Sequence, residues 1–164
     1  MLVYIILSVA YKFYLQYSDG SKFYPDYFTN LISRQTEALL NTLGYKTTVL
    51  PHPDEPSMKL IINGSYLSRI IEGCNGISVI ILFIAFIVAF AGTLKTTFLY
   101  ILSGSVIIYV FNLLRIVAFG LAIYHYPEYT EFLHAVLFPA AIYGTLFLLW
   151  IFWVNRFSKL NPKT

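Results

Sequence analysis

Residues 76–92 read GISVIILFIAFIVAFAG, and this uncharged run decides the class of the protein. A bilayer-spanning helix needs about 20 predominantly apolar residues, so the run predicts a membrane helix. The composition agrees, because 58% of the 164 residues are hydrophobic and only 12% are charged, whereas a soluble domain has about 45–50% apolar and about 25% charged residues. We therefore expect an integral membrane protein, and the composition excludes a soluble globular domain and a disordered chain.

Three further apolar stretches cover residues 2–17, 97–123 and 132–154. The first is short and contains Lys12, whose ammonium group can reach a membrane interface. It could instead be a signal peptide, because residues 8–10 (SVA) resemble a small-residue cleavage site. Together the four stretches predict an all-α polytopic membrane protein with about four transmembrane helices.

The distribution of charge predicts the orientation of the chain. All eight acidic residues lie between the first and second stretches or between the third and fourth. The gap between the second and third stretches holds Lys95, and the C-terminal tail holds Arg156, Lys159 and Lys163 without an acid. Since Lys and Arg near the span ends mark the cytoplasmic side, we expect both termini inside. The predicted divisions are a first transmembrane helix at 1–17, an extracytoplasmic cap region at 18–73, a three-helix membrane core at 74–155 and a basic cytoplasmic tail at 156–164.

The long loop between the first two stretches predicts a small α+β cap. Leucines recur at helical spacing over residues 27–43, and Gly44 can end that helix. Residues 46–50 and 58–62 are rich in β-branched and apolar side chains and predict two short strands, separated by a proline-rich turn. Residues 66–71 are expected to lead into the second membrane helix.

Three reactive side chains are predicted to share one depth at the outer interface. Cys74 directly precedes the second stretch, and His134 lies at the start of the fourth. Arg115 lies 18 residues after Thr97 in the third stretch. At about 1.5 Å per residue this is about 27 Å, close to the roughly 30 Å thickness of the hydrocarbon core. Three separate helices would therefore bring a thiol, a guanidinium and an imidazole to the same leaflet.

The chemistry of these three groups is that of covalent catalysis. A nearby Arg or protonated His stabilises the thiolate form of Cys74, and the N-terminus of a helix adds a partial positive charge. His134 can take and return protons near neutral pH, and Arg115 can stabilise an oxyanion. Attack by the thiolate on a carbonyl would form a thioester that passes to an amine, a hydroxyl or water.

Each residue alone also has a structural explanation. A lone cysteine in an apolar chain is usually inert packing, and Arg115 and His134 could be polar groups that reach an interface. A non-enzymatic scaffold that binds a partner through its outer cap is therefore an alternative. A transporter half would need polar residues at mid-membrane depth, which the sequence lacks. Nucleic-acid binding is disfavoured, because a net charge of +3 without a basic run makes no phosphate-binding surface.

Two other candidate sites are weaker. Four possible metal ligands recur at every third position, namely His125, Glu128, Glu131 and His134. Pro127, however, interrupts any helix that would align them. Residues 103–105 (SGS) could hold a serine nucleophile, although small residues within a membrane helix more often permit close helix packing. Gly120 has the same packing interpretation. The single cysteine excludes an internal disulfide and a multi-cysteine zinc site. No metal and no cofactor is expected.

Two short motifs and one histidine carry a family resemblance. Residues 72–76 (EGCNG), residues 112–116 (NLLRI) and His134 present Cys, Arg and His in that order at the outer ends of successive membrane stretches. This arrangement resembles the exosortase/archaeosortase family, and most of all its small exosortase F branch. The resemblance covers about residues 58–155.

The resemblance implies a membrane-embedded cysteine transpeptidase or protease of the bacterial cytoplasmic membrane, active on its extracytoplasmic side. Its substrates would be exported proteins that end in a short motif, a transmembrane helix and a basic tail. By resemblance, Cys74 is the nucleophile, Arg115 the transition-state stabiliser and His134 the acid/base. The matching motifs imply supporting roles for their other polar and glycine residues, Glu72, Asn75, Gly76 and Asn112.

Overall fold

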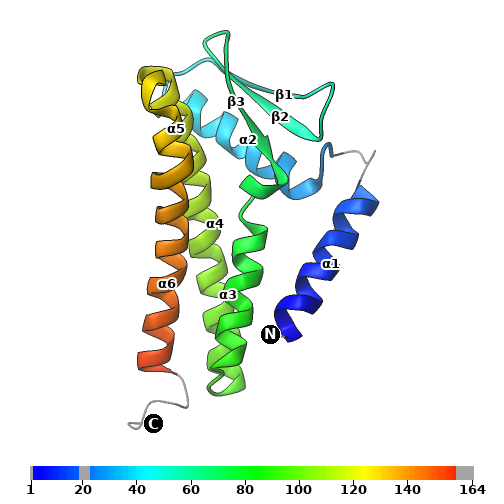
Figure 1. Ribbon diagram of the computed structural model, residues 1–164, viewed down its shortest axis with the longest axis vertical. Helices are drawn as coiled ribbons and strands as arrows, with labels where there is room; N and C mark the ends of the chain where they lie inside the picture. The colour runs from blue at the N-terminus through cyan, green and yellow to red at the C-terminus, as the bar shows by residue number, and fades with distance from the viewer. Residues whose placement is uncertain (1, 19–22, 158–164) are drawn as a thin grey trace.

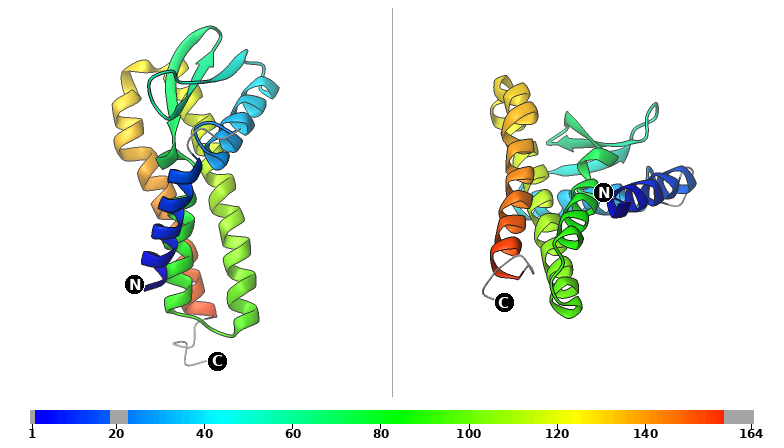
Figure 2. Two further views of the ribbon diagram at one scale, coloured as in Figure 1. Left: turned by 90° about the vertical axis from the view of Figure 1, so that its right-hand side faces the viewer. Right: turned by 60° about the horizontal axis from the view of Figure 1, so that its bottom comes forward.

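The computed structural model describes residues 2–18 and 23–157. Its long helices lie beside one another, and a smaller layer crosses one end of them (Figures 1 and 2). The long helices are α1 (Leu2–Ser18), α3 (Ile77–Ala89), α4 (Leu94–His125) and α6 (Phe138–Arg156). The predicted tail residues Lys159 and Lys163, like Asp19 of the predicted loop, lie outside the described residues.

Two helical segments of the described chain are long and apolar enough to cross a membrane. They are Leu94–His125, with 32 residues, and Pro127–Arg156, with 30. The prediction of a mostly helical membrane protein is therefore supported, whereas the count of four spans stays a prediction.

The helix within residues 76–92 is shorter than the apolar run that predicts it. α3 has 13 residues, or about 20 Å at ~1.5 Å per residue. It begins after Gly76, which has a left-handed φ of 81°, and ends where Phe90 leaves helical geometry at ψ 38°. The apolar run therefore includes a turn at each end, which hydrophobicity alone does not show.

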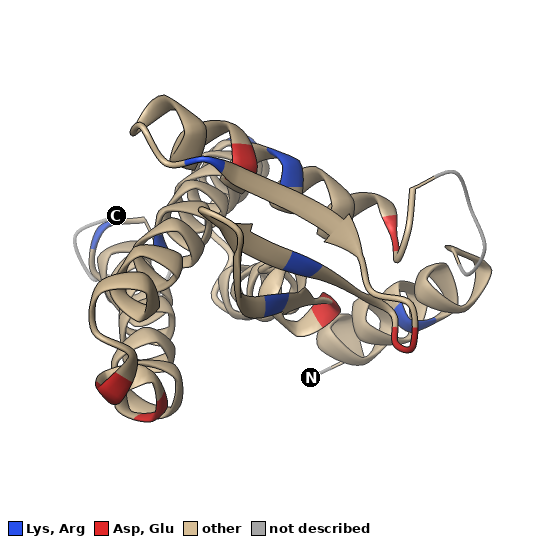
Figure 3. Cartoon of the chain, turned by 90° about the horizontal axis from the view of Figure 1, so that it is seen from above, with Lys and Arg blue, Asp and Glu red and all other residues tan. Residues whose placement is uncertain are grey.

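The two ends of the bundle differ in charge. Every Asp and Glu within residues 23–157 belongs to the end that carries the smaller layer or to the turn between α4 and α6, which lies at the same end (Figure 3). The opposite end carries Lys95 at the start of α4 and Arg156 at the end of α6. The charge asymmetry expected from the sequence is thus present between the two ends of the folded chain.

α3, α4 and α6 pack around a core that contains Phe83, Ile108 and Trp153. Gly104 of α4 lies against the Phe83 ring so closely that an added Cβ would overlap it. The Trp153 indole N–H donates to the Phe90 carbonyl at 2.9 Å. The packing interpretation of the small residues near 104 is therefore confirmed.

Gly104 and Gly144 offer a matched test of this packing. Alanine is about 1 kcal/mol more favourable than glycine inside a helix, but overpacking a core costs about 1–3 kcal/mol. We expect Gly104→Ala to lower the thermal unfolding midpoint in detergent, because its methyl group meets Phe83. Gly144→Ala should leave the midpoint unchanged or raise it, because nothing lies within 4 Å of an added Cβ there. Equal stability of the two variants would contradict the close contact.

The smaller layer consists of α2 (Tyr27–Thr42) and a three-stranded antiparallel sheet; we call these residues, 27–71, the α2–sheet layer. The strands are β1 (Thr47–Pro51), β2 (Ser57–Ile62) and β3 (Ser65–Ile71), in the order β1-β2-β3. The predicted helix and the two predicted strands correspond to α2, β1 and β2, with ends that differ by at most one residue. Residues 66–71 do lead toward α3, but they also form a third strand that the sequence pattern did not indicate.

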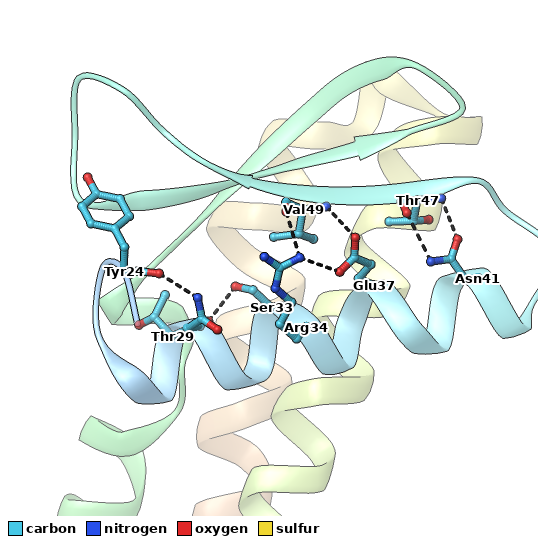
Figure 4. Close-up of polar contacts among 9 residues, drawn as sticks. Tyr24, Thr29, Ser33, Arg34, Glu37, Asn41, Thr47 and Val49 are labelled. Atoms are coloured by element: carbon cyan, nitrogen blue, oxygen red, sulfur yellow. Dashed lines mark hydrogen bonds and ion pairs between the residues drawn. The ribbon is translucent and has the colours of Figure 1, made fainter. Parts of the chain in front are cut away.

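Local polar contacts explain why this layer forms. The Asp26 carboxylate caps α2 by accepting from the backbone N–H groups of Phe28 and Thr29, both at 3.0 Å. Gly44, at φ 92°, ends the same helix in the left-handed conformation expected for glycine. Side chains of α2 then bind the backbone of β1 directly (Figure 4).

An apolar core joins the layer to the bundle. It contains Leu40 from α2, Leu60 and Ile62 from β2, and Ile116 from α4. Gly120 of α4 permits this contact, since an added Cβ would lie 3.1 Å from Leu60 Cδ2. The packing interpretation of Gly120 is confirmed, and the contact places the C-terminal half of α4 directly beneath the sheet.

Candidate active site

Cys74, Arg115 and His134 line one cavity of about 590 Å³. Cys74 ends η1 (Glu72–Cys74), a single 3₁₀ turn between β3 and α3. Arg115 lies on α4, and His134 lies on η3 (Leu133–Leu137), a π-helical turn before α6. The structure therefore brings together, from three elements, the three side chains that the sequence placed at one depth.

The cavity lies between β3 and the walls formed by α4 and α6. Its volume falls within the range of about 300–1,000 Å³ that ligand sites commonly have. One face of α4 supplies a stripe at helical spacing, which consists of Asn112, Arg115, Ile116, Phe119 and Ile123. Of the lining residues that the structure describes, none is Asp or Glu, and two, Arg69 and Arg115, carry guanidinium groups.

Of the predicted supporting residues, Asn112 binds the Cys74 backbone, and Gly76 leaves room for the Asn112 side chain. The side-chain amide of Asn112 donates to the Cys74 carbonyl at 2.7 Å. Gly76 lies at φ 81°, and an added Cβ would lie 3.0 Å from Asn112 Nδ2. Asn112 precedes Arg115 by three residues on the same face of α4, so one short stretch of helix both fixes the cysteine backbone and presents the guanidinium.

Asn75, next to the cavity, joins three helices through hydrogen bonds of its side chain. It is buried, its Oδ1 accepts from the Ile77 N–H at 2.9 Å, and its Nδ2 donates to the Tyr11 hydroxyl at 2.7 Å and to Thr29 Oγ1 at 3.2 Å. One amide thus ties α1, α2 and the start of α3 together beside Cys74. Glu72, by contrast, is exposed and is absent from the lining of the 590 Å³ cavity.

His134 does not lie on the continuous helix that the sequence predicted from residue 132. The chain instead forms η2 (Pro127–Tyr129), α5 (Thr130–Phe132) and the π-helical turn η3 before α6 begins at Phe138. Pro139 contributes to this irregularity, because it lacks the N–H that would bond four residues back. Within the turn, the exposed His134 ring lies 5.6 Å from the Phe119 ring centroid. π-Helical turns occur frequently at functional sites.

Arg69 is a cavity residue that sequence reasoning missed. Its Nη1 lies 2.6 Å from both carboxylate oxygens of Glu55, in the turn between β1 and β2. This hydrogen bond and the guanidinium charge hold the pKa of Glu55 below its usual value. Recognising residues 66–71 as a strand that leads toward Cys74 would have placed Arg69 on a segment that lines the cavity.

Neither of the two weaker candidate sites is assembled among the described residues. Within the parts of the chain that the structure describes, no three His, Cys, Asp or Glu side chains gather around a common point. His125 instead lies 2.9 Å from the Tyr45 hydroxyl. Ser103 donates to the Tyr100 carbonyl at 3.2 Å and is not among the cavity-lining residues.

The fold and the cavity define a helical membrane protein in which a cysteine, an arginine and a histidine line one cavity, at the end of the bundle that carries the acidic residues. Residues 5–155 match the model of the family described as transmembrane exosortase, and the chain belongs to that family. Comparison with curated proteins and with solved structures finds no match. The family resemblance is thus confirmed, while assignment to the small exosortase F branch stays a prediction.

Proposed function

We propose that this protein is a membrane-embedded cysteine transpeptidase or protease that cleaves C-terminal sorting signals of exported proteins. The observation that supports the proposal most is the shared cavity of Cys74, Arg115 and His134. Membership of the exosortase family supports the same class of reaction.

The proposed reaction has two steps and needs no redox partner. The Cys74 thiolate, whose proton has passed to His134, attacks the carbonyl of the scissile peptide bond. Arg115 stabilises the tetrahedral oxyanion. The C–N bond then breaks, His134 protonates the leaving amine, and a thioester to Cys74 remains. An amine, a hydroxyl or water attacks this thioester, gives its proton to His134 and releases the thiolate.

The proposed topology has four membrane helices, α1, α3, α4 and α6, with the α2–sheet layer as an extracytoplasmic cap. Lys95 and Arg156 lie at the end of the bundle opposite the acidic residues. Since Lys and Arg near span ends mark the cytoplasmic side, this difference supports an active site on the outer face of a bacterial cytoplasmic membrane.

The proposed substrate is an exported protein with a short motif, a transmembrane helix and a basic tail at its C-terminus. A cavity at the end of a helical bundle suits a cleavage site just outside a membrane helix. The substrate helix would lie in the bilayer beside the bundle, and its outer juxtamembrane segment would enter the cavity.

The proposal is tested by co-expression with an exported reporter that carries such a C-terminal segment from the same genome. We expect the reporter to lose its transmembrane helix only in cells that contain the protein, which immunoblotting of the reporter would detect. A reporter whose C-terminal helix is replaced by an unrelated single-span helix is the control and should stay intact. If no genome-matched reporter changes in size or attachment, the transpeptidase proposal fails and the scaffold alternative gains support.

A further inference from the structure

The three-stranded sheet has two edges, and α2 covers one of them. On the β1 edge, the Thr47 N–H donates to Asn41 Oδ1 at 2.8 Å, and the Asn41 amide donates back to the Thr47 carbonyl at 3.2 Å. The Val49 N–H donates to Glu37 Oε1 at 3.0 Å, and the Val49 carbonyl accepts from Arg34 Nη1 at 3.2 Å. The backbone groups of these alternate β1 residues therefore have partners within the protein (Figure 4).

β3 forms the opposite edge, and this edge faces the cavity. The strand order β1-β2-β3 leaves β3 with a neighbouring strand on one side only. Six consecutive residues, 66–71, line the cavity. Neighbours such as Arg69 and Ile70 point to opposite faces of a sheet, yet both line the cavity, so the cavity borders the strand edge rather than one face. Among the described residues, no side chain binds the β3 backbone as α2 binds that of β1.

The uncovered edge leads directly to the nucleophile of the proposed reaction. Cys74 lies three residues beyond Ile71, the last residue of β3. Residues 66–71 span roughly 20 Å at ~3.3 Å per residue, so an extended chain laid along them would reach the cysteine. An exposed strand edge binds an extended peptide through backbone hydrogen bonds, and neighbouring pockets then select its side chains.

We propose, on the basis of the proposed function, that the free edge of β3 binds the substrate as an added fourth strand. The occupant is the extended substrate segment that lies directly N-terminal to the cleaved bond. The backbone of this segment pairs with β3. Its side chains contact the apolar walls of the cavity, which include Ile116 and Ile142.

The topology also gives the direction of the added strand. β3 descends from the turn at the far end of the layer to the start of α3 (Figure 1). A substrate of the proposed kind runs in the same sense, from its exported domain toward its membrane helix. The added strand therefore lies parallel to β3, with its C-terminal end at Cys74.

Disulfide cross-linking tests this pairing without relying on activity. The full-length chain with Cys74→Ala contains no other cysteine and receives one new cysteine, either Ser68→Cys in β3 or the matched control Thr48→Cys in β1. The reporter of the co-expression assay carries single cysteines at successive positions of its juxtamembrane segment, and copper phenanthroline is the oxidant. Paired strands lie about 4.8 Å apart, within the Cα separation that a disulfide spans.

We expect Ser68→Cys to form a cross-linked band with one or two adjacent reporter positions, and Thr48→Cys to form none. With Tyr66→Cys the reactive reporter position should move toward the reporter's N-terminus. A move toward its C-terminus would overturn the parallel arrangement. Labelling with a small maleimide shows that each new cysteine is accessible in the folded protein.

The outcomes separate this inference from the proposed function. If wild-type protein processes the reporter but no β3 cysteine cross-links to it above the Thr48→Cys control, strand addition is wrong and the transpeptidase proposal stands. If β3 cross-links form while wild-type protein leaves the reporter intact, edge binding stands and the proposed reaction fails. Absence of both processing and cross-links overturns both.

Discussion

Cys74→Ala is expected to abolish processing of the co-expressed reporter while the protein stays inserted in the membrane. The thiolate forms the bond that carries the acyl group, and no second cysteine exists to replace it. Loss of the nucleophile from a serine protease lowers kcat on the order of 10⁶-fold, so remaining processing should fall below detection. Cys74→Ser preserves the shape of the side chain and should also be inactive, because a hydroxyl forms its anion far less readily than a thiol. Pulse-chase labelling of the reporter measures the rate.

The control for this prediction is Ser103→Ala, which removes the alternative nucleophile. Ser103 bonds to its own helix and lies outside the cavity lining, so its removal should leave the processing rate unchanged. A membrane-impermeant thiol reagent should modify wild-type protein in intact cells and leave Cys74→Ala unlabelled, which also reports the side of the membrane. Wild-type rates in Cys74→Ala would exclude the thiol as nucleophile.

The helices of the bundle were predictable because long, nearly uncharged apolar runs seldom occur outside membrane helices. The predicted stretches at 97–123 and 132–154 correspond to the two segments long enough to cross a bilayer, Leu94–His125 and Pro127–Arg156. The ends of the helices were less predictable. α3 is shorter than its apolar run because a left-handed Gly76 and the turn after Ala89 interrupt the helix without any change in hydrophobicity.

β3 was missed for a physical reason in its own sequence. Its pairing with β2 shifts between Leu60 and Ile61, so that Ser68 and Tyr66 lie opposite these neighbours and Leu67 is the extra residue. Such a bulge breaks the alternation of apolar and polar side chains that identifies a strand. Because the strand was missed, Arg69 and the open edge beside Cys74 were missed with it.

The grouping of the candidate catalytic residues was more predictable than their surroundings. A membrane limits side chains to a few depths, so topology alone indicated that Cys74, Arg115 and His134 share one end of the bundle. Topology could not predict the hydrogen bond from the Asn112 amide to the Cys74 carbonyl, or that from the Asn75 amide to the Tyr11 hydroxyl. These contacts depend on how helices distant in the sequence pack together.

His134→Gln is expected to lower the processing rate by about 10²–10⁴-fold, the usual contribution of a general acid or base. Glutamine keeps a polar side chain of similar reach but cannot take a proton from the thiol or return one to the leaving amine. The loss should therefore appear in kcat with little change in KM. Both constants are measured on purified protein with a peptide that spans the cleaved bond.

His125→Gln is the matched control, because it separates a catalytic role from a general need for histidine at this end of the molecule. His125 is also exposed and ends the helix that carries Arg115, but it bonds to Tyr45 and does not line the cavity. Its replacement should leave both kcat and KM unchanged. The π-helical turn η3 presents His134 differently, beside Phe119 on the stripe of α4 that also carries Arg115. Equal losses in the two variants would show that His134 acts through the fold of this end rather than through proton transfer, and the acid/base would then have to be water.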